Sequence, residues 1–123
     1  MYNAGMSTKP LTPTVFYILL ALSEQNRHGY DILKRSVLDS EGQVRMAAGT
    51  LYNALQRLVD DGLVEEAGER PAPERDDERR RYYTLTERGR QALVAEVERM
   101  GRAVQRAEEQ IARGRKGRTT WTT

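Results

Sequence analysis

The most constraining feature of this sequence is a helical repeat of apolar residues between positions 47 and 62. These residues recur at intervals of three and four, which predicts one buried stripe, made of Leu51, Ala54, Leu55, Leu58 and Val59. The opposite face carries a hydroxyl, a phenol, two amides and a guanidinium, on Thr50, Tyr52, Asn53, Gln56 and Arg57. Amides and arginine can bond base edges, and hydroxyls suit phosphate oxygens. An isolated segment of this kind is more often an ordinary surface helix, so the rest of the chain must decide.

Both ends of this central helix are marked in the sequence. The small residues Ala47, Ala48 and Gly49 at its start would let that end approach another surface closely. Gly62 indicates a left-handed stop at the other end, with Leu63 packing back on the helix. The central helix is therefore predicted to end just before Gly62.

Two more helices are expected before the central one. Thr12 and Pro13 form a good helix opening, and residues 15–22 are apolar almost all round, so this first helix should be the most buried. After a polar break, a second helix opens at His28 and has a predicted inner face of Tyr30, Leu33, Val37 and Leu38. Two short helices joined by a glycine-containing turn, the second with a polar outer face, are typical of a helix-turn-helix.

A basic β-hairpin is predicted directly after the central helix. Residues 63–67 are the first strand candidate, residues 68–78 a flexible tip, and residues 79–85 a second strand rich in aromatic and β-favouring side chains. Alternation places Tyr83 and Leu85 on one face of that strand and Tyr82 on the other. We expect Glu65 and Glu66 to oppose the arginines across the hairpin, namely Arg79, Arg80 and Arg81. A basic hairpin in this position is a wing.

The last predicted helix begins after Thr86 and runs to about Arg113. Its apolar residues alternate steps of four and three, a heptad seam of Leu93, Val97, Met100, Val104, Ala107 and Ile111. A seam this long and narrow is too extended for one small domain to cover, so we interpret the helix as a dimerisation helix. The alternative is a single exposed helix that lies along its own domain, which would leave the apolar seam in water.

Composition excludes several classes of protein. The chain has no cysteine and a single histidine, and it lacks a glycine-rich phosphate loop and a metal-ligand cluster, so we expect no enzyme, no metal and no cofactor. The longest apolar run is too short to cross a bilayer, and the first ten residues lack the features of a signal peptide. We therefore expect a cytoplasmic protein without a membrane partner. A formal net charge of +2 permits nucleic-acid binding without demanding it.

Five blocks of sequence, in order, resemble the signatures of PadR-family transcriptional regulators. They lie at residues 28–32, 49–52, 54–58, 61–64 and 81–89, and the resemblance covers about residues 12 to 90. It implies a dimeric winged-helix repressor, sometimes released from its operator by a small molecule or by stress. The single C-terminal helix resembles the shorter subgroup of the family.

These observations predict a mainly α fold with a small β-hairpin, that is, a winged helix-turn-helix followed by a long dimerisation helix. The expected division is a flexible leader (1–11), the DNA-binding domain (12–86), the dimerisation helix (87–113) and a basic flexible tail (114–123). The predicted function is sequence-specific binding of double-stranded DNA by a homodimer. The alternative is a winged-helix module that binds proteins. The residues expected to contact DNA are Gly49, Thr50, Tyr52, Asn53, Gln56, Arg57, Arg79, Arg80 and Arg81.

Overall fold

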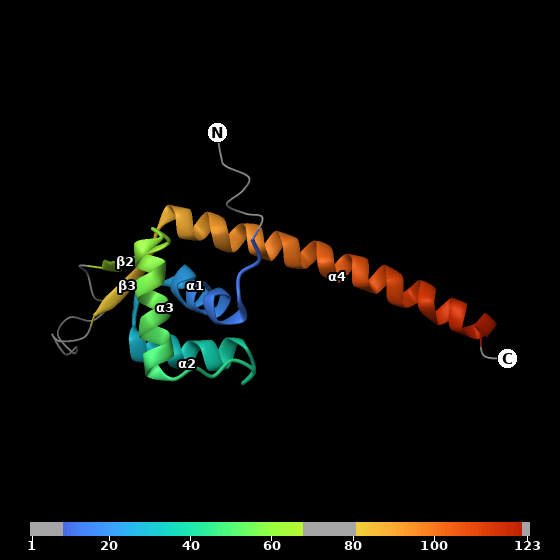
Figure 1. The fold of residues 1–123 in the computed structure, drawn as a ribbon, viewed down its shortest axis with the longest axis horizontal. Helices are drawn as coiled ribbons and strands as arrows, with labels where there is room; N and C mark the ends of the chain where they lie inside the picture. Colours follow the sequence, from blue (N-terminus) through green and yellow to red (C-terminus); the bar gives the residue numbers. More distant parts are fainter. Residues whose placement is uncertain (1–8, 68–80, 122–123) are drawn as a thin grey trace.

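The computed structural model describes residues 9–67 and 81–121 of the chain, and within them four helices and a small antiparallel sheet (Figure 1). The elements, in chain order, are α1 (Pro13–Glu24), β1 (Arg27–His28), α2 (Gly29–Asp39), α3 (Ala48–Asp60), β2 (Val64–Ala67), β3 (Tyr82–Leu85) and α4 (Glu87–Trp121). The strand order in the sheet is β1-β3-β2. This is a winged helix-turn-helix with a long C-terminal helix, and the predicted fold class is confirmed.

The hydrophobic core is built around α1. Thr12 caps this helix by accepting a hydrogen bond from the Val15 amide (3.2 Å), and Pro13 occupies the first turn, as the sequence predicted. Ile18 and Leu19 are fully buried. They share one core cluster with residues from every neighbouring element, among them Ile32, Leu51, Leu55, Val64 and Leu93.

The inner face of α2 differs from the predicted one. Tyr30 and Leu38 are 63% and 65% exposed, whereas Ile32 and Ser36 are buried. The helix begins at Gly29 and is capped by His28, whose Nδ1 accepts a hydrogen bond from the Asp31 amide. Positions 29, 32 and 36 then share the inward face at helical spacing, and positions 30 and 38 cannot join them. Hydrophobicity alone selected the wrong residues.

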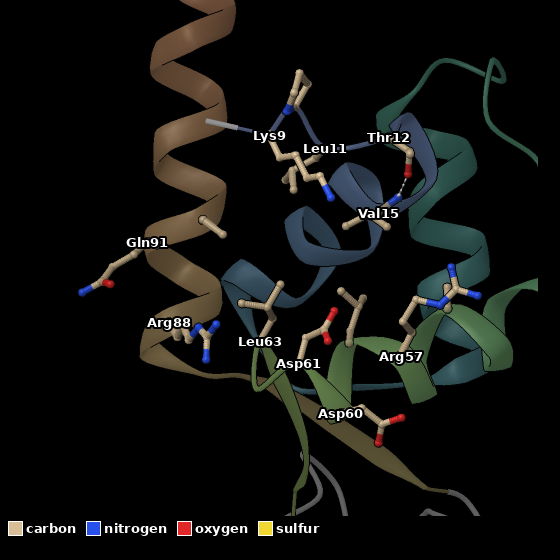
Figure 2. Close-up of a pocket in the computed structure, with 14 residues that line it drawn as sticks. Lys9, Leu11, Thr12, Val15, Arg57, Asp60, Asp61, Leu63, Arg88 and Gln91 are labelled. Atoms are coloured by element: carbon tan, nitrogen blue, oxygen red, sulfur yellow. Dashed lines mark hydrogen bonds between the residues drawn. The ribbon is translucent and has the colours of Figure 1, made fainter. Parts of the chain in front are cut away.

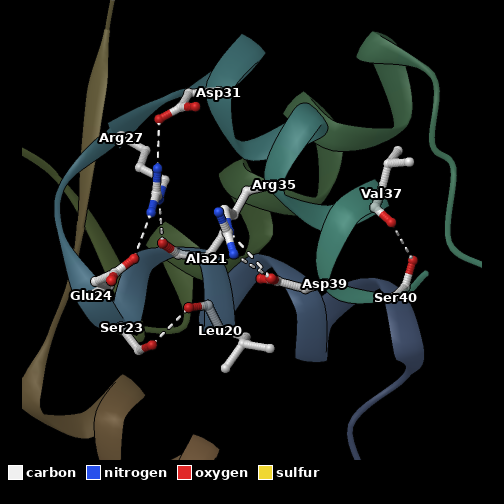
Figure 3. Close-up of polar contacts among 10 residues, drawn as sticks. All are labelled: Leu20, Ala21, Ser23, Glu24, Arg27, Asp31, Arg35, Val37, Asp39 and Ser40. Atoms are coloured by element: carbon white, nitrogen blue, oxygen red, sulfur yellow. Dashed lines mark hydrogen bonds and ion pairs between the residues drawn. The ribbon is translucent and has the colours of Figure 1, made fainter. Parts of the chain in front are cut away.

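The sequence gave no sign of strand β1, which lies in the predicted polar break. Its two residues pair with β3, Arg27 opposite Tyr83 and His28 opposite Tyr82. The Arg27 side chain is buried and fully used (Figure 3), because it donates to the Ala21 carbonyl (2.6 Å), Asp31 (2.8 Å) and Glu24 (3.0 Å). These bonds fix the link between α1 and α2. A strand of two residues carries no periodicity that a sequence pattern could reveal.

The wing is an antiparallel pair, but its register differs from the expected charge pairing. Glu65 faces Thr84 and Glu66 faces Tyr83, so neither glutamate lies opposite an arginine. Arg81 reaches Glu66 from beyond the strand at 3.6 Å, and both side chains are exposed, so this ion pair adds little stability. Tyr82 is buried against the His28 ring, 5.2 Å between centroids, because β1 covers a face that a two-stranded hairpin would leave open.

The end of α3 and the start of α4 are joined by hydrogen bonds. Gly62 terminates α3 with a φ of 81°, the left-handed stop that was predicted. The Thr86 hydroxyl donates to the Gly62 carbonyl (2.7 Å) and accepts from the Gly89 amide (2.9 Å), which caps α4. The orientation of α4 is thereby fixed relative to the end of α3.

Gly89 allows α4 to approach the chain after α3 closely. A Cβ added there would collide with the Leu63 carbonyl oxygen and lie 2.8 Å from Leu85 Cδ1, whereas nothing lies within 4 Å of one added at Gly101. Because a backbone carbonyl cannot easily move away, we expect Gly89→Ala to lower the free energy of unfolding by about 1–3 kcal/mol. Gly101→Ala should instead stabilise the helix by about 1 kcal/mol. Urea denaturation of both variants measures these changes, and equal effects would contradict the close approach.

Helix α4 projects far beyond the body of the protein (Figure 1). Residues 101–116 are all exposed, and the helix continues past Arg113, the expected end, to Trp121. Arginine and lysine are good helix formers, which favours this continuation. None of the helices in the described part of the chain is long and apolar enough to cross a membrane.

The segment before α1 is bound to α4. The Leu11 amide donates to Glu96 Oε1 (3.2 Å), and Arg99 donates to the Lys9 carbonyl (3.2 Å) and pairs with Glu96. Glu96 is only 7% exposed. Residues 9–11, which belong to the predicted leader, therefore form a strap across the first turns of α4.

Candidate nucleic-acid interface

Helix α3 presents the predicted polar face to solvent. Leu51, Leu55 and Leu58 are buried, while all six α3 residues expected to contact DNA are exposed: Gly49, Thr50, Tyr52, Asn53, Gln56 and Arg57. The start of the helix is open as well. Its cap residue, Ala47, makes no side-chain cap, and the first turn holds no acidic residue. The free backbone N–H groups and the positive end of the helix dipole there favour a negatively charged partner.

The outward residues divide into a centre and two edges. At 100° per residue, Asn53 and Gln56 lie near the middle of the exposed face, with Tyr52 on one edge and Arg57 on the other. Gln56 Nε2 donates to Asp60 Oδ1 (3.1 Å), so its amide must leave Asp60 before it can bond a base. Asn53 makes no hydrogen bond to any described residue beyond those of the helix backbone. Of the two amides, Asn53 is therefore the one ready to bind.

Tyr52 has a structural contact that sequence reasoning missed. Its side chain is 47% exposed, yet its ring lies over Gly29 at the start of α2. A Cβ added at Gly29 would come within 2.6 Å of Tyr52 Cζ. Tyr52 thus sits between α2 and α3, and its hydroxyl lies close to the first turn of α2.

We expect Gly29→Ala to destabilise the protein by about 1–3 kcal/mol, because the new methyl group overlaps the Tyr52 ring. In a Tyr52→Ala background the same substitution should cost much less, since the colliding ring is gone. Thermal unfolding of the wild type, both single variants and the double variant gives the coupling energy. Additive effects would mean that the ring does not rest on Gly29.

The described part of the wing carries both signs of charge. Arg81 is exposed and paired with Glu66, and Glu65 and Glu66 are themselves exposed. Arg79 and Arg80 lie outside the described residues. Arg81 is therefore the one wing arginine whose position is known, and its cation is partly offset by Glu66.

Burial raises the pKa of the Tyr83 phenol above its ordinary value of 10.0, and the charges of Glu66 and Tyr52 add to the rise while Arg81 opposes it. Folding thus favours the neutral phenol. Its contribution to stability should be complete below pH 10 and lost as the pH rises through the folded-state pKa. We expect Tyr83→Phe to make unfolding less sensitive to pH above 10, measured by urea denaturation across that range. An identical pH dependence in both proteins would contradict this.

The predicted seam of α4 is only partly available to a partner. Leu93 is 6% exposed and packs in the core of its own chain. The other four committed residues lie on the surface, namely Val97 (49%), Met100 (43%), Val104 (56%) and Ile111 (62%). Val94, which the seam did not include, is 48% exposed. The free apolar surface therefore starts one turn later than the sequence pattern suggested.

No group of three or more histidines, aspartates or glutamates within the described ranges could hold a metal ion. What the fold offers is an exposed polar helix held on a compact core beside a two-stranded wing. This arrangement defines the class of winged-helix DNA-binding transcriptional regulators.

Residues 18–95 match the model of the transcriptional regulator PadR-like family, which is more than half of the chain. The protein belongs to this family, whose members are transcriptional regulators and not enzymes. A comparison of the sequence with curated proteins gave no significant match.

Solved structures with the same fold include three informative relatives. H. salinarum RosR is 28% identical, with 87% of this chain and 96% of that chain covered and a TM-score of 0.60. Bacillus subtilis PadR in complex with operator DNA is 23% identical (69% and 45% covered, TM-score 0.56). Bordetella bronchiseptica BpsR, whose DNA binding is regulated by 6-hydroxynicotinic acid, is 25% identical (77% and 63% covered, TM-score 0.57).

Proposed function

We propose that this protein is a sequence-specific transcriptional repressor that binds an inverted-repeat operator as a homodimer. The observation that carries the proposal is the exposed face of α3. It holds amide, hydroxyl and guanidinium groups, and its one carboxylate, Asp60, lies at the far end of the helix. Such a face suits the major groove of DNA, where amides and arginine distinguish base pairs. It does not suit a protein partner that needs an apolar surface.

Within this interface the residues take different roles. Thr50, together with the open start of α3, contacts phosphates, and Tyr52 does so beside the first turn of α2. Asn53, Gln56 and Arg57 read base edges, Asn53 first because its amide is free. The wing arginines Arg79, Arg80 and Arg81 add phosphate contacts that are independent of sequence and sensitive to salt.

The homodimer is supported by the exposed apolar residues of α4. Beyond Gly101 the helix has no neighbour in its own chain, and isolated helices depend on packing for most of their stability. A second copy of α4 would cover the seam of Val97, Met100, Val104 and Ile111. A dimer also brings two α3 helices to half-sites about 34 Å apart, the spacing of one DNA turn.

Release of the operator by a small molecule completes the proposal. The regulation of B. bronchiseptica BpsR by 6-hydroxynicotinic acid supports an effector of this kind for a related fold. The solved complex of B. subtilis PadR with operator DNA supports the mode of binding through the shared fold.

Selection of bound sequences from a random DNA pool tests the proposed function. We expect an inverted repeat whose half-sites are centred one helical turn apart. Enrichment of single, unpaired sites would contradict the dimeric mode of binding. A pool that remains unselected after several rounds, while the chain is folded, would contradict sequence-specific binding altogether.

A further inference from the structure

A cleft of about 670 Å³ opens where the end of α3 meets the start of α1 and the first turns of α4 (Figure 2). Apolar side chains from the three sides line it, including Leu11, Val15, Leu58 and Leu63. Pockets that bind small molecules typically measure about 300–1,000 Å³ and are largely apolar, with a few polar groups. The size and lining of this cleft match that description.

Charged side chains surround the apolar lining. Arg57 and Arg88 stand on opposite sides of Asp61, and Lys9 extends over the cleft from the strap (Figure 2). Within the described ranges, Arg57, Arg88 and Lys9 form no ion pair, although carboxylates lie nearby. Asp60 is instead bonded to Gln56. Two guanidinium groups beside an apolar surface are therefore available to a ligand, and guanidinium groups bind carboxylates in a paired geometry.

We propose that this cleft is the effector site of the regulator and binds a small monocarboxylic acid with an apolar body. The carboxylate pairs with Arg57 or Arg88, and the body lies over Leu58 and Leu63. Asp61 restricts the choice, because a ligand with several negative charges is repelled by it, and a neutral ligand gains nothing from the arginines. The regulatory role rests on the proposed DNA-binding function, whereas occupation of the cleft does not.

The position of the cleft explains how an occupant acts on DNA binding. Arg57 belongs to the edge of the α3 face that is proposed to read bases, so a carboxylate that pairs with it removes one contact from the operator. Arg88 belongs to α4, and Lys9 to the strap that Glu96 and Arg99 hold on that helix. A bound acid therefore joins α3 to the helix that sets the distance between half-sites.

Binding is tested on the full chain by ¹H–¹⁵N NMR with four acids: benzoate, 1-naphthoate, 4-methylpentanoate and octanoate. We expect saturable shifts at the amides of residues 61–63 and 88–92 with at least one acid, and none with its neutral amide or with naphthyl phosphate. Arg88→Gln should weaken binding about 10- to 100-fold, as loss of a charged hydrogen bond does. Arg90→Gln, an exposed arginine on the same turn outside the cleft, should leave it unchanged. If no acid shifts these amides, or if both variants bind alike, the site is refuted.

The regulatory role is tested separately with operator DNA. The acid that binds should weaken operator binding of the wild type about tenfold, the effect of losing one base contact. It should leave the already weaker binding of Arg57→Gln unchanged. Amide shifts without any change in DNA affinity would overturn the regulatory role. A chain that binds no DNA at all would refute the proposed function, while the amide shifts would still decide whether the cleft is a binding site.

Discussion

Val97→Asp and Val104→Asp are each expected to give monomers that keep their helical content and lose the operator. Both valines are about half exposed in the single chain, so neither change disturbs its core. In a symmetric dimer each substitution counts twice, and a buried apolar side chain contributes about 1.5–3 kcal/mol. The dimerisation constant should therefore fall by about 10²- to 10⁴-fold. Light scattering and circular dichroism at micromolar concentration measure the two properties.

The control is Gln105→Asp, which introduces the same residue one position after Val104 and outside the seam. This variant should remain dimeric and bind the operator like the wild type. If it dissociates as readily as Val104→Asp, the interface is not the predicted seam. If the valine variants remain dimeric, a different surface joins the subunits.

Asn53→Asp is expected to weaken operator binding by at least about tenfold, and to relax the base preference at one position of each half-site. The substitution keeps the size of the side chain but replaces an amide donor with a carboxylate at the centre of the exposed α3 face. Loss of one paired base contact costs about 1–3 kcal/mol, and repulsion by the phosphates adds to it. Stability should change little, because Asn53 is exposed.

Gln105→Glu adds the same negative charge on α4, far from α3 in the chain, and serves as the matched control for overall charge. It should bind the operator like the wild type. Fluorescence anisotropy against the selected operator and against single-base variants separates affinity from specificity. An Asn53→Asp protein with unchanged affinity and unchanged base preference would remove Asn53 from the interface.

Features encoded by a few neighbouring residues could be predicted from the sequence. The cap at Thr12, the buried stripe of α3 and the left-handed stop at Gly62 all depend on contacts within one turn of a helix. Each has a strong local signal, and the structure confirms each of them. The order of sequence blocks then indicated the winged-helix fold.

Features that depend on distant residues could not be predicted in this way. Strand β1 exists because β3 lies beside it, and the burial of Tyr82 follows from that pairing. Leu93 fits a heptad seam equally well whether it faces a partner or its own core, and only the packed chain decides. The contact of Tyr52 with Gly29 joins residues whose helices must first be placed. The cleft beside Arg57 likewise forms between elements that are far apart in the chain.

The stoichiometry of the chain on its selected operator tests the central claim most directly. Analytical ultracentrifugation of the wild type, alone and with a duplex that carries the inverted repeat, measures it. We expect a dimer in free solution and two chains on each duplex, with a duplex of one half-site bound at least about a hundredfold more weakly. A monomer that binds one half-site as tightly as the full repeat, without a second chain joining it, would contradict the claim.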